Sequence, residues 1–111
     1  PSTGMTFHPT NNPVFWKQTA DELLASSRFE KAHAAYLQLC ELTPNDAEAW
    51  RGMAQALTGL ERYSDAIAAY ERTLVLLPDD TVALNGLAGC YEKLGDFEKM
   101  TACRIRLSEL D

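Results

Sequence analysis

Few side chains in this 111-residue chain have the type and spacing that catalysis or metal binding requires. His8 and His33 are the two histidines, and neither lies at metal-ligand spacing from a cysteine, a carboxylate and the other histidine. The sequence contains no Gly-rich phosphate loop, no G-x-S-x-G motif and no H-E-x-x-H motif. We therefore expect a protein that is not an enzyme and that holds no metal or cofactor.

The cysteines do not suggest chemistry either. Cys40, Cys90 and Cys103 are odd in number, share no C-x-x-C spacing and lie among apolar residues. This pattern predicts reduced thiols buried in a core. Reduced thiols favour a reducing compartment, so the expected location is the cytoplasm.

Charge and hydropathy limit the expected partners. The chain has 16 acidic and 10 basic residues, a net charge of -6, and no two adjacent Lys or Arg residues. Affinity for nucleic acid or an anionic membrane needs clustered positive charge, so we expect neither partner. No stretch approaches the roughly 20 apolar residues of a membrane-spanning helix. The expected partner is another protein or a peptide.

The chain repeats itself with a period of 34 residues, the distance between Pro44 and Pro78. Blocks that begin at Pro13, Ala47 and Thr81 carry similar residues at matching places. The matching sets are Trp16/Trp50/Leu84, Leu23/Leu57/Tyr91, Phe29/Tyr63/Phe97, Ala32/Ala66/Met100, Tyr36/Tyr70/Arg104 and Leu42/Leu76/Leu110. A period of this size indicates a helical solenoid.

Apolar residues recur at helical spacing twice in each block, which predicts two amphipathic helices per repeat. The expected helices span residues 14–26, 29–42, 47–59, 63–76, 81–94 and 97–110. Residues 1–12 are rich in turn formers and are expected to form an extended tail, in which the apolar Met5 and Phe7 could dock into a groove.

The expected loops carry helix-ending and helix-starting residues. Pro44 and Pro78 would each end one helix, and the carboxylate that follows would accept hydrogen bonds from free N–H groups of the next. Capping would then account fully for the acidic pair Asp79-Asp80. Gly59 and Gly95 are expected where paired helices reverse direction.

These residues resemble the tetratricopeptide repeat (TPR) family. The middle block carries the pattern most fully, with Ala47, Trp50, Met53, Ala54, Leu57, Tyr63, Ala66, Tyr70, Leu74, Leu76 and Pro78. The resemblance implies an all-α fold, a right-handed α-solenoid of three helix-turn-helix pairs, with repeats at 13–46, 47–80 and 81–111. It also implies a non-catalytic protein–protein interaction module, a scaffold or adaptor that binds a peptide or helix in a concave groove.

In this family the first helix of each pair lines the groove, through the second, fifth, ninth and twelfth places of each block. The residues expected to bind a partner there are Lys17, Asp21, Leu24, Glu48, Arg51, Gln55, Asn85, Gly89 and Glu92. Val14, Thr58 and Val82 complete the lining.

Two questions about the groove stay open. Lys17 and Arg51 would either pair with Asp21 and Glu48 or bind a ligand with acidic side chains. Gly52, Gly86 and Gly89 would either leave room for a ligand or allow close helix packing.

One subgroup of the family binds the C-terminal carboxylate of chaperones through a clamp of lysine, asparagine and arginine. Lys17 matches the first lysine of that clamp, but the asparagines fall on Asp21 and Gly52, and the basic pair falls on Val82 and Gly86. We therefore expect no chaperone-tail binding.

The last helix departs from the pattern, since Met100 replaces a small residue and Arg104 an aromatic one. This fits a terminal repeat or ordinary sequence drift. Ile105, Leu107 and Leu110 keep the helix partly apolar, so a second hypothesis is a homo-oligomer formed through this C-terminal helix. A third is a regulatory TPR segment of a larger protein.

Overall fold

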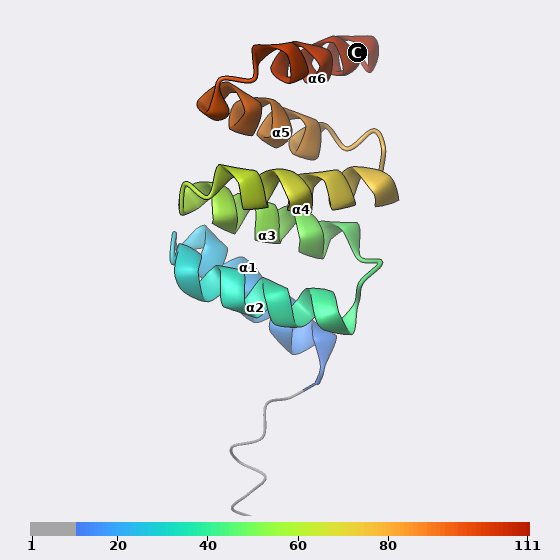
Figure 1. Ribbon diagram of the computed structural model, residues 1–111. Coiled ribbons are helices and arrows are strands. Elements are labelled where there is room, and N and C mark those ends of the chain that lie inside the picture. Colours follow the sequence, from blue (N-terminus) through green and yellow to red (C-terminus); the bar gives the residue numbers. More distant parts are fainter. Residues whose placement is uncertain (1–10) are drawn as a thin grey trace, which may run out of the picture.

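The computed structural model describes residues 11–111, which form six helices and no strand (Figure 1). The helices are α1 (Pro13–Ala25), α2 (Phe29–Leu42), α3 (Ala47–Gly59), α4 (Tyr63–Leu76), α5 (Thr81–Leu94) and α6 (Phe97–Glu109). All six expected helices are confirmed, and no helix end differs from the expectation by more than one residue. Most of the expected tail, including Met5, Phe7 and His8, lies outside the described residues.

The helices form three pairs that are stacked in chain order, as Figure 1 shows. Each helix packs against the next one in sequence, and α3 also contacts α1 and α5. The first helices of the pairs therefore form a continuous row. We call the surface of this row, α1, α3 and α5, the first-helix face.

At both junctions between repeats, a tyrosine of the second helix of one repeat packs against a glycine of the first helix of the next. A Cβ atom added to Gly52 would lie 2.3 Å from Cζ of Tyr36, and one added to Gly86 would lie 2.2 Å from Cζ of Tyr70. Tyr36 is 1% exposed and Tyr70 is 3% exposed, so neither ring has room to move aside. Of the two roles considered for these glycines, close helix packing is therefore the correct one at Gly52 and Gly86.

Small residues allow the helices within each pair to approach closely. Ala20, Ala32, Ala54 and Ala66 are all 0% exposed. Cys40, Cys90 and Cys103 are also buried, as predicted, and burial raises the pKa of all three thiols, that of Cys40 to about 12. At neutral pH these thiols stay protonated, and the described structure contains no disulfide.

Carboxylates begin the first helices of the second and third repeats, as the loop sequences predict. Asp46 accepts a hydrogen bond from the Glu48 N–H, and Asp80 accepts one from the Ala83 N–H. Capping does not, however, account fully for the Asp79-Asp80 pair. Asp79 binds Arg106 of α6 at 2.5 Å, and Asp80 also binds a side chain of the preceding repeat. Besides capping α5, this turn therefore forms salt bridges with side chains of other helices.

Both glycines lie where the paired helices reverse direction, as expected: Gly59 is the last residue of α3, and Gly95 directly follows α5. Gly95 has a left-handed φ of 80°, but the matching residues of the earlier repeats are Ser27 at 59° and Glu61 at 61°. Gly59 ends α3, and a Cβ atom there would lie 2.5 Å from the ring of Phe29. Gly59 is therefore needed for packing between repeats, because it lets the Phe29 ring approach the helix.

The last repeat lacks the tyrosine contact on its outer side. Arg104, which aligns with Tyr36 and Tyr70, is exposed and binds Glu92 at 3.4 Å. Within the described part of the chain, no helix is long and apolar enough to cross a bilayer.

Candidate peptide-binding groove

Five of the nine predicted groove residues surround one hollow on the first-helix face. The hollow has a volume of about 280 Å³ and is lined by Asp21, Leu24, Ala25, Tyr36, Glu48, Arg51, Gly52 and Gln55. Helices α1 and α3 supply its walls. Tyr36 comes from α2 and reaches the hollow because Gly52 has no side chain to block the phenol ring. The sequence identifies Tyr36 only as a member of the repeat pattern, and the packing shows that it also lines this hollow.

Asp21 and Tyr36 form the polar centre of the hollow. The Tyr36 hydroxyl donates a hydrogen bond to Asp21 Oδ1 at 2.5 Å. Burial, followed by the hydrogen bond and the charge of Asp21, raises the pKa of Tyr36, so the phenol stays protonated and remains a donor. Among residues 11–111, no Lys or Arg lies within salt-bridge distance of Asp21.

Lys17 is held between two carboxylates at the junction of the first two repeats. Its ammonium group binds Glu48 and lies 3.8 Å from Asp46. The hydrogen bond with Glu48 raises the pKa of Lys17, and the same bond lowers the pKa of Glu48. Lys17 therefore joins α1 to the start of α3.

Arg51 makes the matching connection one repeat later. Its Nη1 atom binds Asp80 Oδ2 at 2.5 Å, and the Asp80 side chain is only 6% exposed. Lys17 and Arg51 are 34 residues apart, and so are Asp46 and Asp80. Both cations therefore join a first helix to the residue that caps the next first helix, and we call these contacts the Lys17 staple and the Arg51 staple.

The staples answer the question about the groove cations. Lys17 does pair with one of the expected carboxylates, Glu48, but on the neighbouring first helix, whereas Arg51 binds Asp80 and neither expected carboxylate. Asp21 pairs with neither cation. The sequence missed this arrangement because the capping role of Asp80 hides its second role, although the shared 34-residue spacing was a usable signal.

The predicted residues of α5 do not reach the hollow between α1 and α3. Asn85 Nδ2 donates a hydrogen bond to the Thr81 carbonyl of its own helix at 3.0 Å, and Glu92 pairs with Arg104. A Cβ atom added to Gly89 would have nothing within 4 Å. Gly89 is thus the one glycine of the three considered that leaves open space, and it aligns with Asp21 and Gln55 of the earlier repeats.

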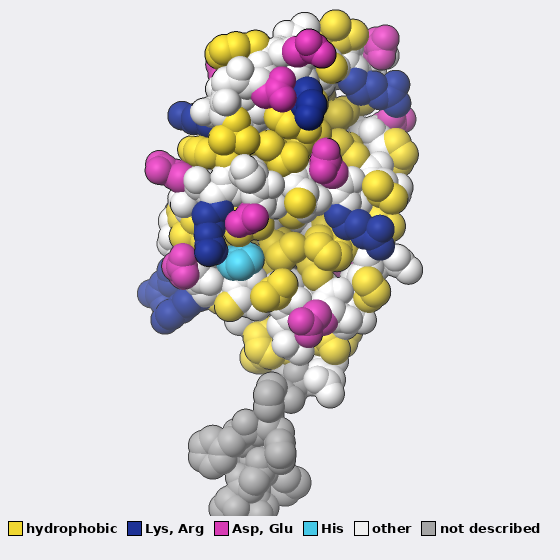
Figure 2. All heavy atoms as spheres, viewed as in Figure 1, with side chains coloured by type: hydrophobic (Ala, Val, Ile, Leu, Met, Phe, Trp, Pro, Cys, Tyr) yellow, Lys and Arg dark blue, Asp and Glu magenta, His cyan; other side chains and the backbone are white. Residues whose placement is uncertain are grey.

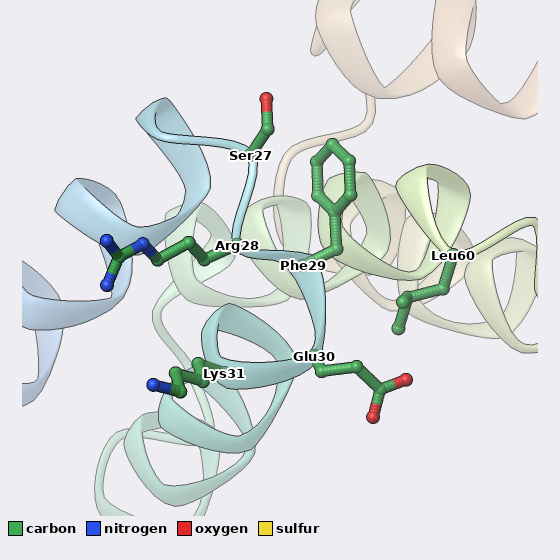
Figure 3. A pocket seen from close by; sticks show the side chains of 6 residues that line it. All are labelled: Ser27, Arg28, Phe29, Glu30, Lys31 and Leu60. Atoms are coloured by element: carbon green, nitrogen blue, oxygen red, sulfur yellow. The ribbon is translucent and has the colours of Figure 1, made fainter.

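Other hollows lie away from the predicted residues. One of about 480 Å³ lies beside the turn between α1 and α2 and is lined by Ser27, Arg28, Phe29, Glu30, Lys31 and Leu60 (Figure 3). Figure 3 shows its side chains diverging from the turn instead of converging on one point, so it offers no polar centre.

A further hollow, of about 280 Å³, is lined by residues of α2, α3 and α4, among them His33, Leu37 and Trp50. Figure 2 shows hydrophobic side chains gathered at the centre of the surface that it views. Trp50 itself is held by the Pro44 carbonyl, which accepts from the indole N–H at 2.8 Å, and by Arg72 over its ring. In residues 11–111 no group of three or more His, Cys, Asp or Glu side chains is arranged to hold a metal ion.

Comparisons with known proteins agree with this architecture. A chain of MamA (MSR-1) superposes with a TM-score of 0.86 at 21% identity, over 91% of this chain and 58% of that one. A second MamA structure, that of a mutant, gives a TM-score of 0.87 at 21% identity, over 93% of this chain and 74% of that one. The chain therefore spans less than two thirds of the MamA chain from MSR-1.

The type III secretion translocator chaperone SycD of Yersinia enterocolitica has a similar fold. It gives a TM-score of 0.85 at 20% identity, over 92% of this chain and 77% of that one. No curated protein sequence matches the chain. The family model for the tetratricopeptide repeat matches residues 18–81 and, in a second match, 53–99. With this match over most of its length and with three stacked helix pairs, the chain belongs to the tetratricopeptide repeat family.

Proposed function

We propose that this chain is a non-catalytic protein-interaction module that binds a peptide or helix of another protein along the first-helix face. The observation that carries the proposal is the continuous row of α1, α3 and α5, in which the hollow at Asp21 is followed by open space at Gly89. Such a preformed surface can accept a partner chain without the cost of ordering its own backbone.

The comparisons support an interaction role. SycD is named as a chaperone of a secretion translocator, and its structure is named as an alternative dimer. We extend binding of another protein to this chain as part of the proposal. The three buried thiols support a cytoplasmic location, and the acidic net charge favours a protein partner over nucleic acid or an anionic membrane.

Selection from a phage library of random 12-residue peptides tests the proposal. Gly89→Arg places a long side chain in the open space of the first-helix face, while Ala34→Arg makes the same change in charge at an exposed position on α2. Peptides selected on the wild type are expected to keep binding Ala34→Arg and to lose Gly89→Arg. Peptides that bind Gly89→Arg but not Ala34→Arg would contradict the groove assignment.

Self-association through α6 is the second candidate function, because Ile105 is 55% exposed on this helix. If it operates, sedimentation equilibrium of the wild type will show a mass that rises with concentration, and Ile105→Glu will remain a monomer. A monomeric wild type over the same concentrations would remove this candidate and leave the groove proposal unaffected.

A further inference from the structure

We infer that the hollow between α1 and α3 receives a basic side chain, Arg or Lys, from the peptide bound on the first-helix face. This inference rests on the proposed function and names the chemistry of its partner. It reverses the earlier alternative that the groove cations would select a ligand with acidic side chains.

The cations of this region are already engaged by carboxylates of the same chain. Lys17 is bound to Glu48 and close to Asp46, and Arg51 is bound to Asp80 at 2.5 Å. An acidic ligand could reach either cation only by displacing one of these carboxylates. It would also have to approach Asp21 and Glu48, and like charges at close range disfavour such a complex.

Negative charge is in excess around the hollow. The staples and the hollow contain four carboxylates and two cations; the carboxylates are those of Asp21, Asp46, Glu48 and Asp80. Asp21 is the one of the four that forms no described salt bridge, and its hydrogen-bond partner is the uncharged Tyr36 hydroxyl. A cation from a ligand could therefore form the salt bridge that Asp21 lacks within the described chain.

Hydrogen-bond acceptors of α1 and α3 line the same hollow. Asp21 has a second carboxylate oxygen that takes no described hydrogen bond, since Tyr36 binds Oδ1. The Gln55 amide lines the same hollow, one helix away on α3, and no described residue bonds to it. A guanidinium or ammonium group has several donors and can use both acceptors at once.

The hollow has the volume and the apolar lining that a long basic side chain needs. A volume of about 280 Å³ is sufficient for the end of a long side chain, and its lining includes Leu24 and the aromatic Tyr36. The methylene groups of Arg or Lys can lie along such apolar surface while the charged end meets the carboxylate.

Four peptide libraries with a fixed central residue test the inference. Each is a fluorescein-labelled 11-residue peptide mixture with uncharged residues at all other positions and Arg, Lys, Gln or Glu at the centre. Fluorescence anisotropy is expected to show that the Arg or Lys library binds the wild type at least about 10-fold more tightly than the Glu library, as expected for a charge-assisted contact. This preference should weaken as salt is added.

Asp21→Asn removes the charge while keeping an oxygen that can accept from Tyr36. It is expected to weaken binding of the preferred basic library by about 10-fold and to leave the Gln library unchanged. Glu22→Gln, the adjacent exposed residue that does not line the hollow, makes the same change in net charge and should have no effect. Asp21→Lys should reverse the preference towards the Glu library. Thermal unfolding followed by circular dichroism verifies that each variant is folded.

The inference and the proposed function fail in different ways. If the Gln or Glu library binds as tightly as both basic ones, and Gly89→Arg abolishes that binding, the groove function stands and the inference is overturned. If Asp21→Asn and Glu22→Gln weaken the basic library equally, the effect is one of net charge and the inference is again overturned. If no library binds the folded wild type, the proposed function itself is contradicted.

Discussion

The two junctions on the first-helix face share one packing arrangement but differ in the side chains that they offer to a ligand. At the first junction Tyr36 lies over Gly52, and at the second Tyr70 lies over Gly86. A basic residue at the fifth place of the block, Lys17 or Arg51, joins each junction to the next capping aspartate.

The positions that face a ligand have changed between these junctions. Where the first has Asp21 and Glu48, the second has Gln55 and Val82. Val82 is 45% exposed, and the glycine at position 89 leaves space open. The ligand-facing positions are thus charged at the first junction, and neutral and partly apolar at the second.

The contrast separates two kinds of residue. The repeated residues hold the helices in register, because a large ring and a missing side chain must coincide at each junction. The residues that vary lie on the open surface, where a change costs little packing energy and alters only what can bind. A ligand that spans both junctions should therefore present a basic residue to the first and an apolar one to the second.

The largest expected effect distinguishes glycines that pack from the glycine that leaves space. Gly52→Ala and Gly86→Ala are each expected to lower the free energy of unfolding by about 2 kcal/mol, because the new methyl group overlaps a buried tyrosine ring. Gly89→Ala should instead raise it by up to about 1 kcal/mol through better helix propensity. Urea denaturation measures all three.

A double variant provides the control for this prediction. Tyr70→Leu removes the ring that the methyl group would meet, so Gly86→Ala should cost less in that background than in the wild type. Equal costs in the two backgrounds would mean that the contact between Tyr70 and Gly86 does not determine the effect.

A smaller effect is expected from comparing the two staples. Arg51→Met is expected to lower the free energy of unfolding by about 1.5 kcal/mol, because it leaves the nearly buried Asp80 carboxylate without its cation. Lys17→Met should cost less than about 0.5 kcal/mol, since Lys17 and Glu48 are well exposed. Thermal unfolding should show the same order in Tm. A larger loss for Lys17→Met would contradict the difference in burial.

The smallest expected effect is a pH dependence of the stability that comes from the Lys17–Glu48 pair at the first junction. The pKa of Glu48 is lowered by Lys17, so its contribution to stability is present above the ordinary glutamate pKa of about 4.3 and is lost as pH falls through the lower folded value. Wild type should therefore have a slightly higher Tm than Glu48→Gln at pH 7, and the same Tm at about pH 3.

Lys17→Gln breaks the same pair from its other partner and serves as the control. It should remove the same pH-dependent part of the stability, so that adding Glu48→Gln to it changes Tm equally at both pH values. A difference between wild type and Glu48→Gln that persists at low pH would show that Glu48 acts through packing and not through its charge.

The scaffold could be predicted from the amino-acid sequence without coordinates. The 34-residue period, the alanines at helix contacts and the turn residues at Pro44 and Pro78 each act locally or between neighbouring helices, so their pattern is visible along the chain. All six helices and the burial of the thiols were predicted on this basis. Membership of the family followed from the same residues.

How the groove is used, in contrast, depends on the packing of the helices. A glycine allows close helix packing where a side chain of another helix contacts it, and leaves open space where none does. Tyr36 contacts Gly52, whereas no atom lies within 4 Å of a Cβ added to Gly89. The pairing of Arg51 with Asp80 joins a helix to a capping residue 29 positions away, and the pairing of Asp21 with Tyr36 joins two helices across 15 positions. Such pairs depend on distances between helices that a sequence period does not contain, and they determine which charges remain for a partner.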